Sequence, residues 1–259
     1  MFDLKDRVAI VTGGGLGLGA AISAKLAACG AKIAIADISA ENARQSCEAI
    51  EAVGGTAKAF RHDVTDWDAA RALVRNVEGD LGPIDILVNN AGVSKLVPIT
   101  EMTGQEWDRL FHINLKGQFA MASAVAPGMM ERRRGRIVNM ASVVSKQGYP
   151  KFSHYCSSKF GVVGFTQSIA KELAEYEITV NAVCPGIVMT PLHDGIVQQM
   201  ADAAGVSVTE AKTNFVGNIP LKRPQEPQDV ANMVAYLASD LARNMTGGTY
   251  HVDGGMMMD

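Results

Sequence analysis

Short apolar runs alternate with longer helical patterns along most of the chain. Runs rich in β-branched residues predict seven strands, at residues 7–12, 32–36, 57–61, 84–89, 135–140, 178–184 and 248–252. The patterns between them predict helices over residues 20–29, 40–53, 67–80, 105–133, 153–176 and 229–238. The helix over 105–133 is expected to bend near Pro127, because proline has no backbone N–H to donate. Strands that alternate with helices predict an α/β fold with a single domain over residues 1–259, a doubly wound (Rossmann-type) parallel sheet with helices on both faces.

One segment departs from this alternation. Residues 191–224 contain Gly195, Gly205 and Gly217 and have no strand pattern. We expect this segment to form a mobile helical lid over a binding site. Ligands of doubly wound sheets bind beyond the carboxyl ends of the strands, so the residues that directly follow each strand carry the functional information.

Composition and charge exclude several classes of function. The formal net charge of −3 gives no bulk attraction to nucleic acid or to an anionic membrane, and Arg132–Arg134, the only basic run, is expected at a helix end. No apolar run reaches the roughly 18 residues of a membrane span, and the N-terminus does not resemble a signal peptide. The four cysteines are scattered without a CxxC pair, which favours reduced thiols in a cytoplasmic protein. No metal site is expected, because the histidines lack ligand spacing.

A glycine-rich loop follows the first predicted strand. Residues 12–19 read TGGGLGLG. Backbone without side chains can approach a pyrophosphate closely, and the start of the next helix offers N–H groups and a positive dipole. The spacing is G-x-x-x-G-x-G rather than G-x-G-x-x-G, so the generic dinucleotide fingerprint does not match literally, and a turn without a ligand is the alternative. The cofactor contacts expected here are Gly13, Leu16, Gly17, Leu18 and Gly19.

The second strand ends on an acidic residue, Asp37, 18 positions beyond Gly19. A carboxylate at this place can accept hydrogen bonds from the hydroxyls of an adenosine ribose and would repel a 2′-phosphate. No lysine or arginine lies in residues 13–19 or directly after Asp37 to neutralise such a phosphate. The sequence therefore predicts NAD rather than NADP as the cofactor, with simple capping of the next helix by Asp37 as the alternative.

The third and fourth strands are also followed by candidate cofactor residues. Asp63 and Val64 offer a short acceptor beside a small apolar group, which suits an adenine edge, although a cap before Trp67 is an alternative. The run NNAG at 89–92 combines small residues, which allow close approach of the backbone, with amides that can brace the sheet edge. The further cofactor contacts expected from these strand ends are Ile38, Asp63, Val64, Asn90, Ala91 and Gly92.

Candidate chemistry lies in the second half of the chain. Tyr155 and Lys159 are four residues apart in a predicted helix and therefore share a face. A lysine cation beside a phenol favours the phenolate and lowers the tyrosine pKa, which makes the phenol usable in general acid–base catalysis. Ser142 follows the fifth strand, where its hydroxyl could bond a substrate oxygen. An isolated Y-x-x-x-K is ordinarily a solvated helix face, but here it accompanies the glycine loop, Asp37 and Ser142.

These motifs together resemble the short-chain dehydrogenase/reductase family over essentially the whole chain. The strings that carry the resemblance are TGGGLGLG, NNAG, HINLKG, IVNMAS, YCSSK, CPGIVMT and HVDGG. IVNMAS has Ala141 where many members carry a second serine. The resemblance implies a nicotinamide-dependent oxidoreductase, usually a homotetramer, with a catalytic tetrad of Asn114, Ser142, Tyr155 and Lys159.

The resemblance also assigns roles to these residues. Tyr155 would transfer the hydroxyl proton, Ser142 would hold the substrate oxygen, and Lys159 would bind the nicotinamide ribose. Asn114 would lie at a bend in its helix and hold a water that links Lys159 to solvent. The residues implied to contact the nicotinamide end are Pro185, Gly186, Val188 and Thr190.

The substrate is less well determined by the sequence. The stretch from Tyr155 onward is similar to bacterial dehydrogenases of acetoin, butanediol and sugar alcohols, and NAD favours oxidation, so a small polyol, sugar alcohol or vicinal diol is expected. The alternative is a 3-oxoacyl thioester (acyl carrier protein) reductase, which would usually take NADP and so disagrees with Asp37. A non-catalytic NAD-binding regulator is opposed by the intact catalytic residues. The candidate substrate contacts are Ser142, Val144, Gln147, Tyr149, His154, Tyr155, Met189 and His193.

Overall fold

The strands of the protein form one parallel sheet. The computed structural model describes residues 2–258. The strand order is β3-β2-β1-β4-β5-β6-β7, and every neighbouring pair is parallel. This arrangement confirms the predicted doubly wound sheet. The strands are β1 (Val8–Thr12), β2 (Lys32–Asp37), β3 (Thr56–Arg61), β4 (Ile84–Asn89), β5 (Gly135–Met140), β6 (Ile178–Pro185) and β7 (Thr249–Val252).

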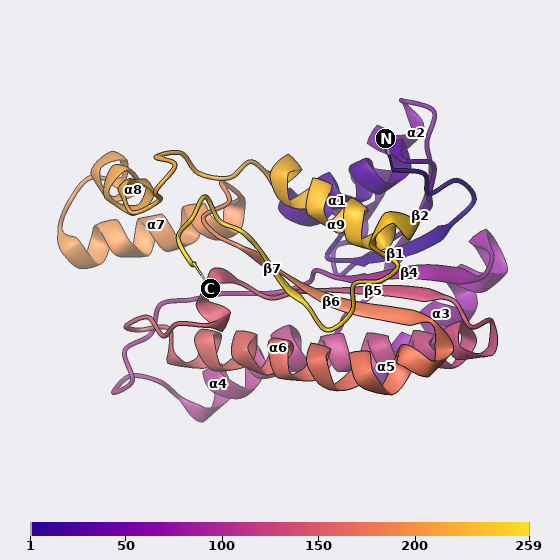
Figure 1. Ribbon diagram of the computed structural model, residues 1–259. Helices are drawn as coiled ribbons and strands as arrows, with labels where there is room; N and C mark the ends of the chain where they lie inside the picture. The colour runs from indigo at the N-terminus through magenta and orange to yellow at the C-terminus, as the bar shows by residue number, and fades with distance from the viewer. Residues whose placement is uncertain (1, 259) are drawn as a thin grey trace.

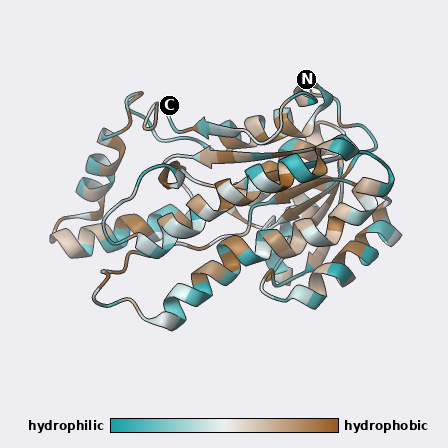
Figure 2. Ribbon diagram, turned by 60° about the horizontal axis from the view of Figure 1, so that its bottom comes forward, coloured by the Kyte–Doolittle hydropathy of each residue, from teal (hydrophilic) through white to brown (hydrophobic). Residues whose placement is uncertain are grey.

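Helices cover both faces of the sheet, because alternate strand residues point to opposite sides. In β1, Ala9 and Val11 belong to one core and Val8 and Ile10 to the other. Figure 1 shows helices on both sides of the sheet, and Figure 2 shows hydrophobic residues along the strands. One face carries α1 (Gly17–Ala28), α2 (Ala40–Glu51) and α9 (Pro227–Ala238), and the other carries α3 (Trp67–Leu81), α5 (Gly117–Glu131) and α6 (Ser153–Leu173).

The predicted helix over 105–133 is interrupted, but not at Pro127. The structure has α4 (Gly104–Phe111), a π-helical turn (His112–Lys116) and then α5, which continues through Pro127. The interruption of the helix thus lies at the π turn, and the expected bend near Pro127, within α5, stays a prediction. The π turn contains Asn114, whose amide makes two hydrogen bonds with the backbone of Val93. A tertiary contact thus accompanies the irregularity, as is common for π turns at functional sites.

Residues 191–224 form two helices beyond the carboxyl ends of the strands (Figure 1). These are α7 (Pro191–Ala204) and α8 (Val208–Gly217), which pack against each other through Val197, Ala201 and Ala211. Gln199 of α7 accepts a hydrogen bond of 3.0 Å from the backbone N–H of Leu96, in the loop after β4. The segment is therefore connected to the body of the protein beside the strand ends.

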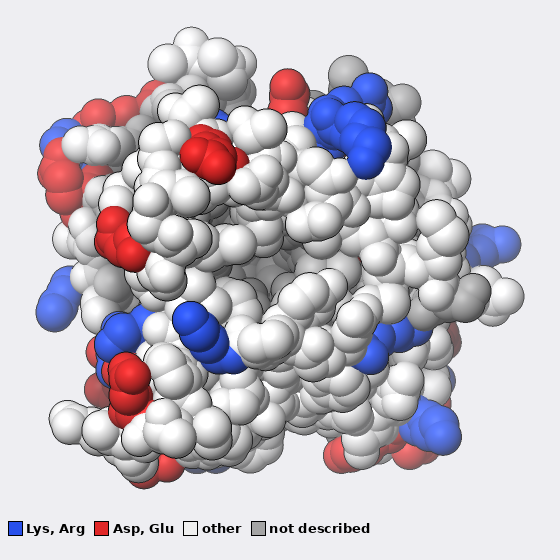
Figure 3. Space-filling model, turned by 90° about the vertical axis from the view of Figure 1, so that its left-hand side faces the viewer, with Lys and Arg blue, Asp and Glu red and all other residues white. Residues whose placement is uncertain are grey.

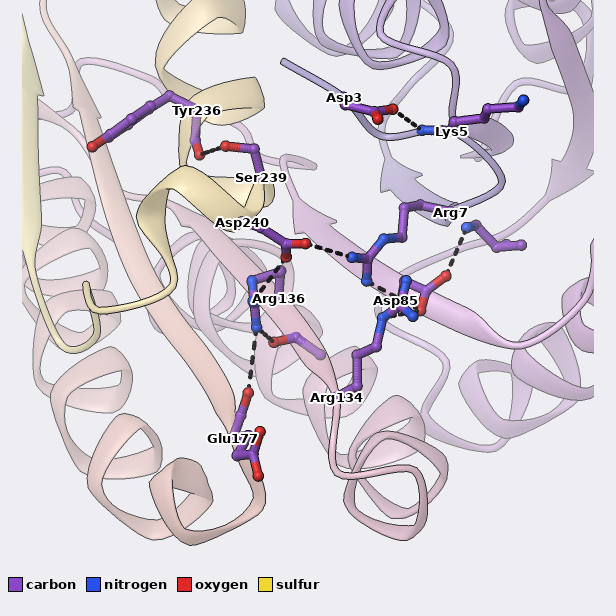
Figure 4. Close-up of polar contacts among 12 residues, drawn as sticks. Asp3, Lys5, Arg7, Asp85, Arg134, Arg136, Glu177, Tyr236, Ser239 and Asp240 are labelled. Atoms are coloured by element: carbon purple, nitrogen blue, oxygen red, sulfur yellow. Dashed lines mark hydrogen bonds and ion pairs between the residues drawn. The ribbon is translucent and has the colours of Figure 1, made fainter.

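Ion pairs connect the strands at their amino-terminal ends, on the side of the sheet opposite to α7 and α8 (Figure 4). Arg7, before β1, lies 3.0 Å from Asp240 and 3.8 Å from Asp85. Arg134 pairs with Asp85 at 3.2 Å, and Arg136 of β5 pairs with Asp240 at 3.2 Å. Partly exposed pairs of this kind stabilise weakly one by one, yet together they join β1, β4, β5 and the end of α9. The amino-terminal ends of these strands are thus occupied by ion pairs, and a ligand site is expected at their carboxyl ends.

The cysteines, possible metal ligands and helix lengths bear on the expectations that came from composition. All four cysteines are buried and free, and burial raises the pKa of Cys47 and Cys184 to about 11, so both are protonated at neutral pH. Within residues 2–258, no group of three His, Cys, Asp or Glu side chains is arranged to hold a metal ion. No helix of this described part has the length and apolar character needed to cross a membrane.

We predict that Gly19→Ala disrupts the start of α1. A Cβ at Gly19 would overlap the carbonyl oxygen of Gly13 and lie 2.6 Å from the Asn90 amide nitrogen, and neither group can move freely. The expected loss of unfolding free energy is about 2 kcal/mol or more, measured by urea denaturation. Gly79→Ala in α3, where a Cβ would meet nothing within 4 Å, is the control and should be neutral or slightly stabilising. Equal stability of the two variants would contradict the packing argument.

Candidate active site

A cavity of about 260 Å³ opens at the carboxyl edge of the sheet. Figure 3 views this end of the molecule, where charged side chains lie mainly toward the periphery and the middle of the face consists mostly of uncharged residues. Most of the site residues expected from the sequence and from the family resemblance line this cavity together. They are Gly13, Leu16, Gly17, Leu18, Gly19, Asn90, Ala91, Gly92, Ser142, Tyr155, Lys159, Pro185, Gly186, Val188, Thr190 and His193.

The glycine loop has the form that a pyrophosphate needs. The helix α1 begins at Gly17, and the preceding residue, Leu16, caps it with no side-chain hydrogen bond. The first-turn residues Gly17, Leu18 and Gly19 line the cavity, no side chain caps the helix start, and no acidic residue lies in that turn. Gly13 and Gly17 have φ values of +60° and +56°, a region that side chains other than glycine rarely adopt. The loop thus fits the phosphates of a dinucleotide.

Asp37 anchors the loop as well as ending β2. Its carboxylate accepts hydrogen bonds from the backbone N–H groups of Gly15, at 3.0 Å, and Ser39, at 2.9 Å. The cap of α2 is Ser39, so the alternative of Asp37 as the helix cap does not hold. Each carboxylate oxygen retains a lone pair for a ribose hydroxyl. Neither Asp37 nor the exposed Ile38 lines the cavity. Arg61 of β3 is in register with Asp37 and is a neighbouring cation that the local sequence around Asp37 did not indicate.

The residues after β3 and β4 are fixed by local bonds. Asp63 accepts hydrogen bonds from the backbone and hydroxyl of Thr65, which lower the pKa of its carboxyl, while the cap of α3 is Asp66. Val64 packs so closely on Gly117 that a Cβ there would lie 2.9 Å from it. Neither Asp63 nor Val64 lines the cavity. Asn90, by contrast, donates to the carbonyls of Thr12 and Gly13, both at 3.0 Å, and so holds the glycine loop against the end of β4.

Tyr155 and Ser142 face each other in the cavity and share a hydrogen bond. Burial raises the pKa of Tyr155 to about 12, and the bond to Ser142 opposes this only in part. The Lys159 ammonium donates to the carbonyl of Met140 at 2.8 Å and lies 5.8 Å from the Tyr155 ring centre, while burial lowers its pKa to about 8. The expected lowering of the Tyr155 pKa by Lys159 is not seen in this arrangement, where burial is the largest cause of the shift and the hydrogen bond with Ser142 is the one cause that lowers the pKa.

Asn114 is fully buried and holds the loop that follows β4. Its amide oxygen accepts from the Val93 N–H at 2.8 Å, and its amide nitrogen donates to the Val93 carbonyl at 2.9 Å. The same nitrogen lies 3.4 Å from the hydroxyl of Ser158, which donates to the Tyr155 carbonyl. Asn114 thus connects the cavity wall at Val93 with α6, the helix that carries Tyr155 and Lys159. The water that it was expected to hold stays a prediction.

The predicted substrate residues are divided between the cavity and its surroundings. Val144 and Tyr149 pack with Tyr155 in a small apolar cluster, joined by Met256 and Met257 of the C-terminal segment. Gln147 is exposed, His154 is fully buried, and neither lines the cavity; nor does Met189. The cavity residues that sequence reasoning missed are Val93, Met140, Ala141, Pro191 and Leu192. Their positions directly beside the recognised motifs were the only signal that could have found them.

Comparison with known proteins identifies the family. The model of the short chain dehydrogenase family matches residues 7–201. The chain belongs to the short-chain dehydrogenase family. It is similar to the 3-oxoacyl-(acyl-carrier-protein) reductase FabG of Staphylococcus aureus, with 39% identity over 97% of this chain and 98% of that protein. The protein of the same name from Haemophilus influenzae is 38% identical, and the alignment covers 98% of this chain and 100% of that protein. The one from Thermotoga maritima is 36% identical, with 98% of this chain and 99% of that protein covered.

The buried Lys159 of this short-chain dehydrogenase predicts a pH-dependent stability. Its pKa of about 8 lies below that of an exposed lysine, so the unfolded chain binds more protons between these values and unfolding free energy rises with pH. Between pH 7.5 and 9.5 the rise should be about 2 kcal/mol larger than in Lys159→Met, measured by urea denaturation at each pH. Lys171→Met, at an exposed site, should behave as the wild type. Parallel curves for the wild type and Lys159→Met would contradict burial of the cation.

Proposed function

We propose that this oxidoreductase interconverts the 3-oxo and 3-hydroxy forms of an acyl thioester with NAD(H) as its cofactor. The observation that carries the proposal is the hydrogen-bonded pair of Ser142 and Tyr155 in a cavity that also contains Lys159 and the uncapped start of α1. The relatives of 36–39% identity support a 3-oxoacyl substrate better than the small polyol expected from the sequence. The cavity lining includes no Asp or Glu, which suits an uncharged acyl group.

The mechanism follows from the protonation states of the side chains. With a pKa of about 12, Tyr155 is a neutral phenol at pH 7 and can donate a proton to a ketone oxygen. Ser142 would donate a second hydrogen bond to the same oxygen, which stabilises the negative charge that develops there. When bound, the nicotinamide supplies or accepts the hydride. Lys159, mostly charged below its pKa of about 8, would favour the phenolate left on Tyr155 if its ammonium turned from Met140 toward the phenol.

Asp37 supports NAD over NADP. A 2′-phosphate placed at the end of β2 would meet a buried carboxylate whose two backbone donors hold it in position. The same residue keeps a small polyol or vicinal diol as the second candidate substrate, because NAD favours oxidation. The homotetramer and the closing of residues 191–224 as a lid stay predictions. A non-catalytic role as a regulator is disfavoured because Ser142, Tyr155 and Lys159 line the same cavity.

The reaction class and substrate can be tested together by nicotinamide absorbance. The panel holds an acetoacetyl thioester, butanediols, acetoin and sugar alcohols, each with NAD(H) and NADP(H). We expect thioester reduction with NADH to have the highest kcat/KM, and Tyr155→Phe to lower kcat about 100-fold or more, since the proton donor is removed. Tyr236→Phe, remote from the cavity, should leave the rate unchanged. Preferred oxidation of a polyol would replace the substrate proposal, and full activity of Tyr155→Phe would refute the mechanism.

Cofactor choice can be tested by binding alone. In Asp37→Asn, one of the two backbone N–H groups loses its acceptor, but the shape of the side chain is kept and the charge is gone, so the repulsion of a 2′-phosphate is removed. The ratio of dissociation constants, NADP over NAD, should fall about 10-fold or more in titration calorimetry. Asp68→Asn, an exposed acid of α3, is the charge-matched control and should keep the wild-type ratio. A wild type that binds NADP as tightly as NAD would contradict the role of Asp37.

A further inference from the structure

Six polar side chains line the cavity, and five of them are already occupied by bonds within the protein. The amide of Asn90 donates to two carbonyls of the glycine loop, and Lys159 donates to Met140. Ser142 and Tyr155 bond each other, and Thr190 donates to the Val188 carbonyl at 3.4 Å. The sixth is His193, whose Nδ1 is buried and has no hydrogen-bond partner. A buried ring nitrogen without a partner costs free energy unless a ligand supplies one.

His193 is held in a defined place. It lies in the first turn of α7, where its backbone N–H donates to the Thr190 carbonyl at 2.9 Å. Its ring centre is 6.3 Å from that of Phe215 in α8, so the pairing of the two helices supports the imidazole. Burial lowers the pKa of His193 to about 4, which makes the ring neutral at pH 7. A neutral imidazole offers one N–H donor and one lone pair and suits an uncharged oxygen.

We propose that His193 hydrogen-bonds a second, uncharged oxygen of the substrate, separate from the oxygen held by Ser142 and Tyr155. This inference rests on the proposed function and deepens it, because the second oxygen of a 3-oxoacyl thioester is its thioester carbonyl. His193 would then determine specificity: a ketone without the second oxygen enters the cavity but leaves the imidazole unpartnered. Sites built to bond a polar group discriminate strongly against analogues that lack it.

Matched substrates and matched variants test the role of His193. The substrates are acetoacetyl-N-acetylcysteamine and the thioether in which CH₂ replaces its thioester carbonyl, with 2,3-butanediol and 2-butanol as a parallel pair. His193→Phe keeps a ring beside Phe215 but removes both polar nitrogens. We expect it to lower kcat/KM for the two-oxygen substrate about 10- to 100-fold, mainly through KM, and to change the one-oxygen analogue less than about 3-fold. His193→Asn should restore part of the loss, because its amide also donates and accepts.

The other outcomes separate this inference from the proposed function. Leu192→Ala changes the shape of the same turn without a polar group and should affect both members of a pair alike. Equal losses for both members in His193→Phe, or no loss for either, would overturn the role of His193 while leaving the reaction class intact. Wild-type enzyme that prefers the one-oxygen analogue would overturn it without any variant. A wild type that turns over neither pair would defeat the proposed function and this inference together.

Discussion

The contact between the ends of β1 and β4 is the constraint on which the site depends. The two strands are neighbours in the sheet, but their following helices pass to opposite faces, so a crevice opens between them. At the base of this crevice, the Asn90 amide donates hydrogen bonds to the carbonyls of Thr12 and Gly13. Gly19 must then lie directly against the Gly13 carbonyl, where no side chain fits. The position of α1, and with it any phosphate site, follows from this packing.

Desolvation governs the chemistry of the same crevice. Burial acts on Tyr155 and Lys159 in opposite directions and favours the neutral form of each. A neutral phenol is a proton donor, which is the state of Tyr155 that the proposed reduction of a carbonyl requires. The buried Asn114, in the π turn, holds the backbone of Val93 in the wall of the same cavity.

The sequence was informative where structure is local and weak where it depends on tertiary contacts. Strand runs, the glycine loop and the spacing of Tyr155 and Lys159 could all be read directly, because each reflects one element. The local pattern did not show the π turn, which accompanies the contact of Asn114 with Val93, 21 residues away, and only the family resemblance implied a bend at Asn114. The raised pKa of Tyr155 depends on burial, which spacing does not show. The exposure of Gln147 was likewise invisible, because the direction of a loop side chain has no periodic pattern.

The two residues proposed to select the cofactor and the substrate lie in separate parts of the molecule. Asp37 ends β2 and is fixed by the backbone of Gly15 and Ser39, whereas His193 lies on α7 and is supported by α8. Neither residue takes part in the hydrogen bonds of Asn90 with Thr12 and Gly13 or in the Ser142–Tyr155 pair. If Asp37 selects the cofactor as proposed, one substitution at the end of β2 would change that choice without disturbing the substrate end. The resemblance to 3-oxoacyl reductases over nearly the whole chain is therefore compatible with the proposed preference for NAD.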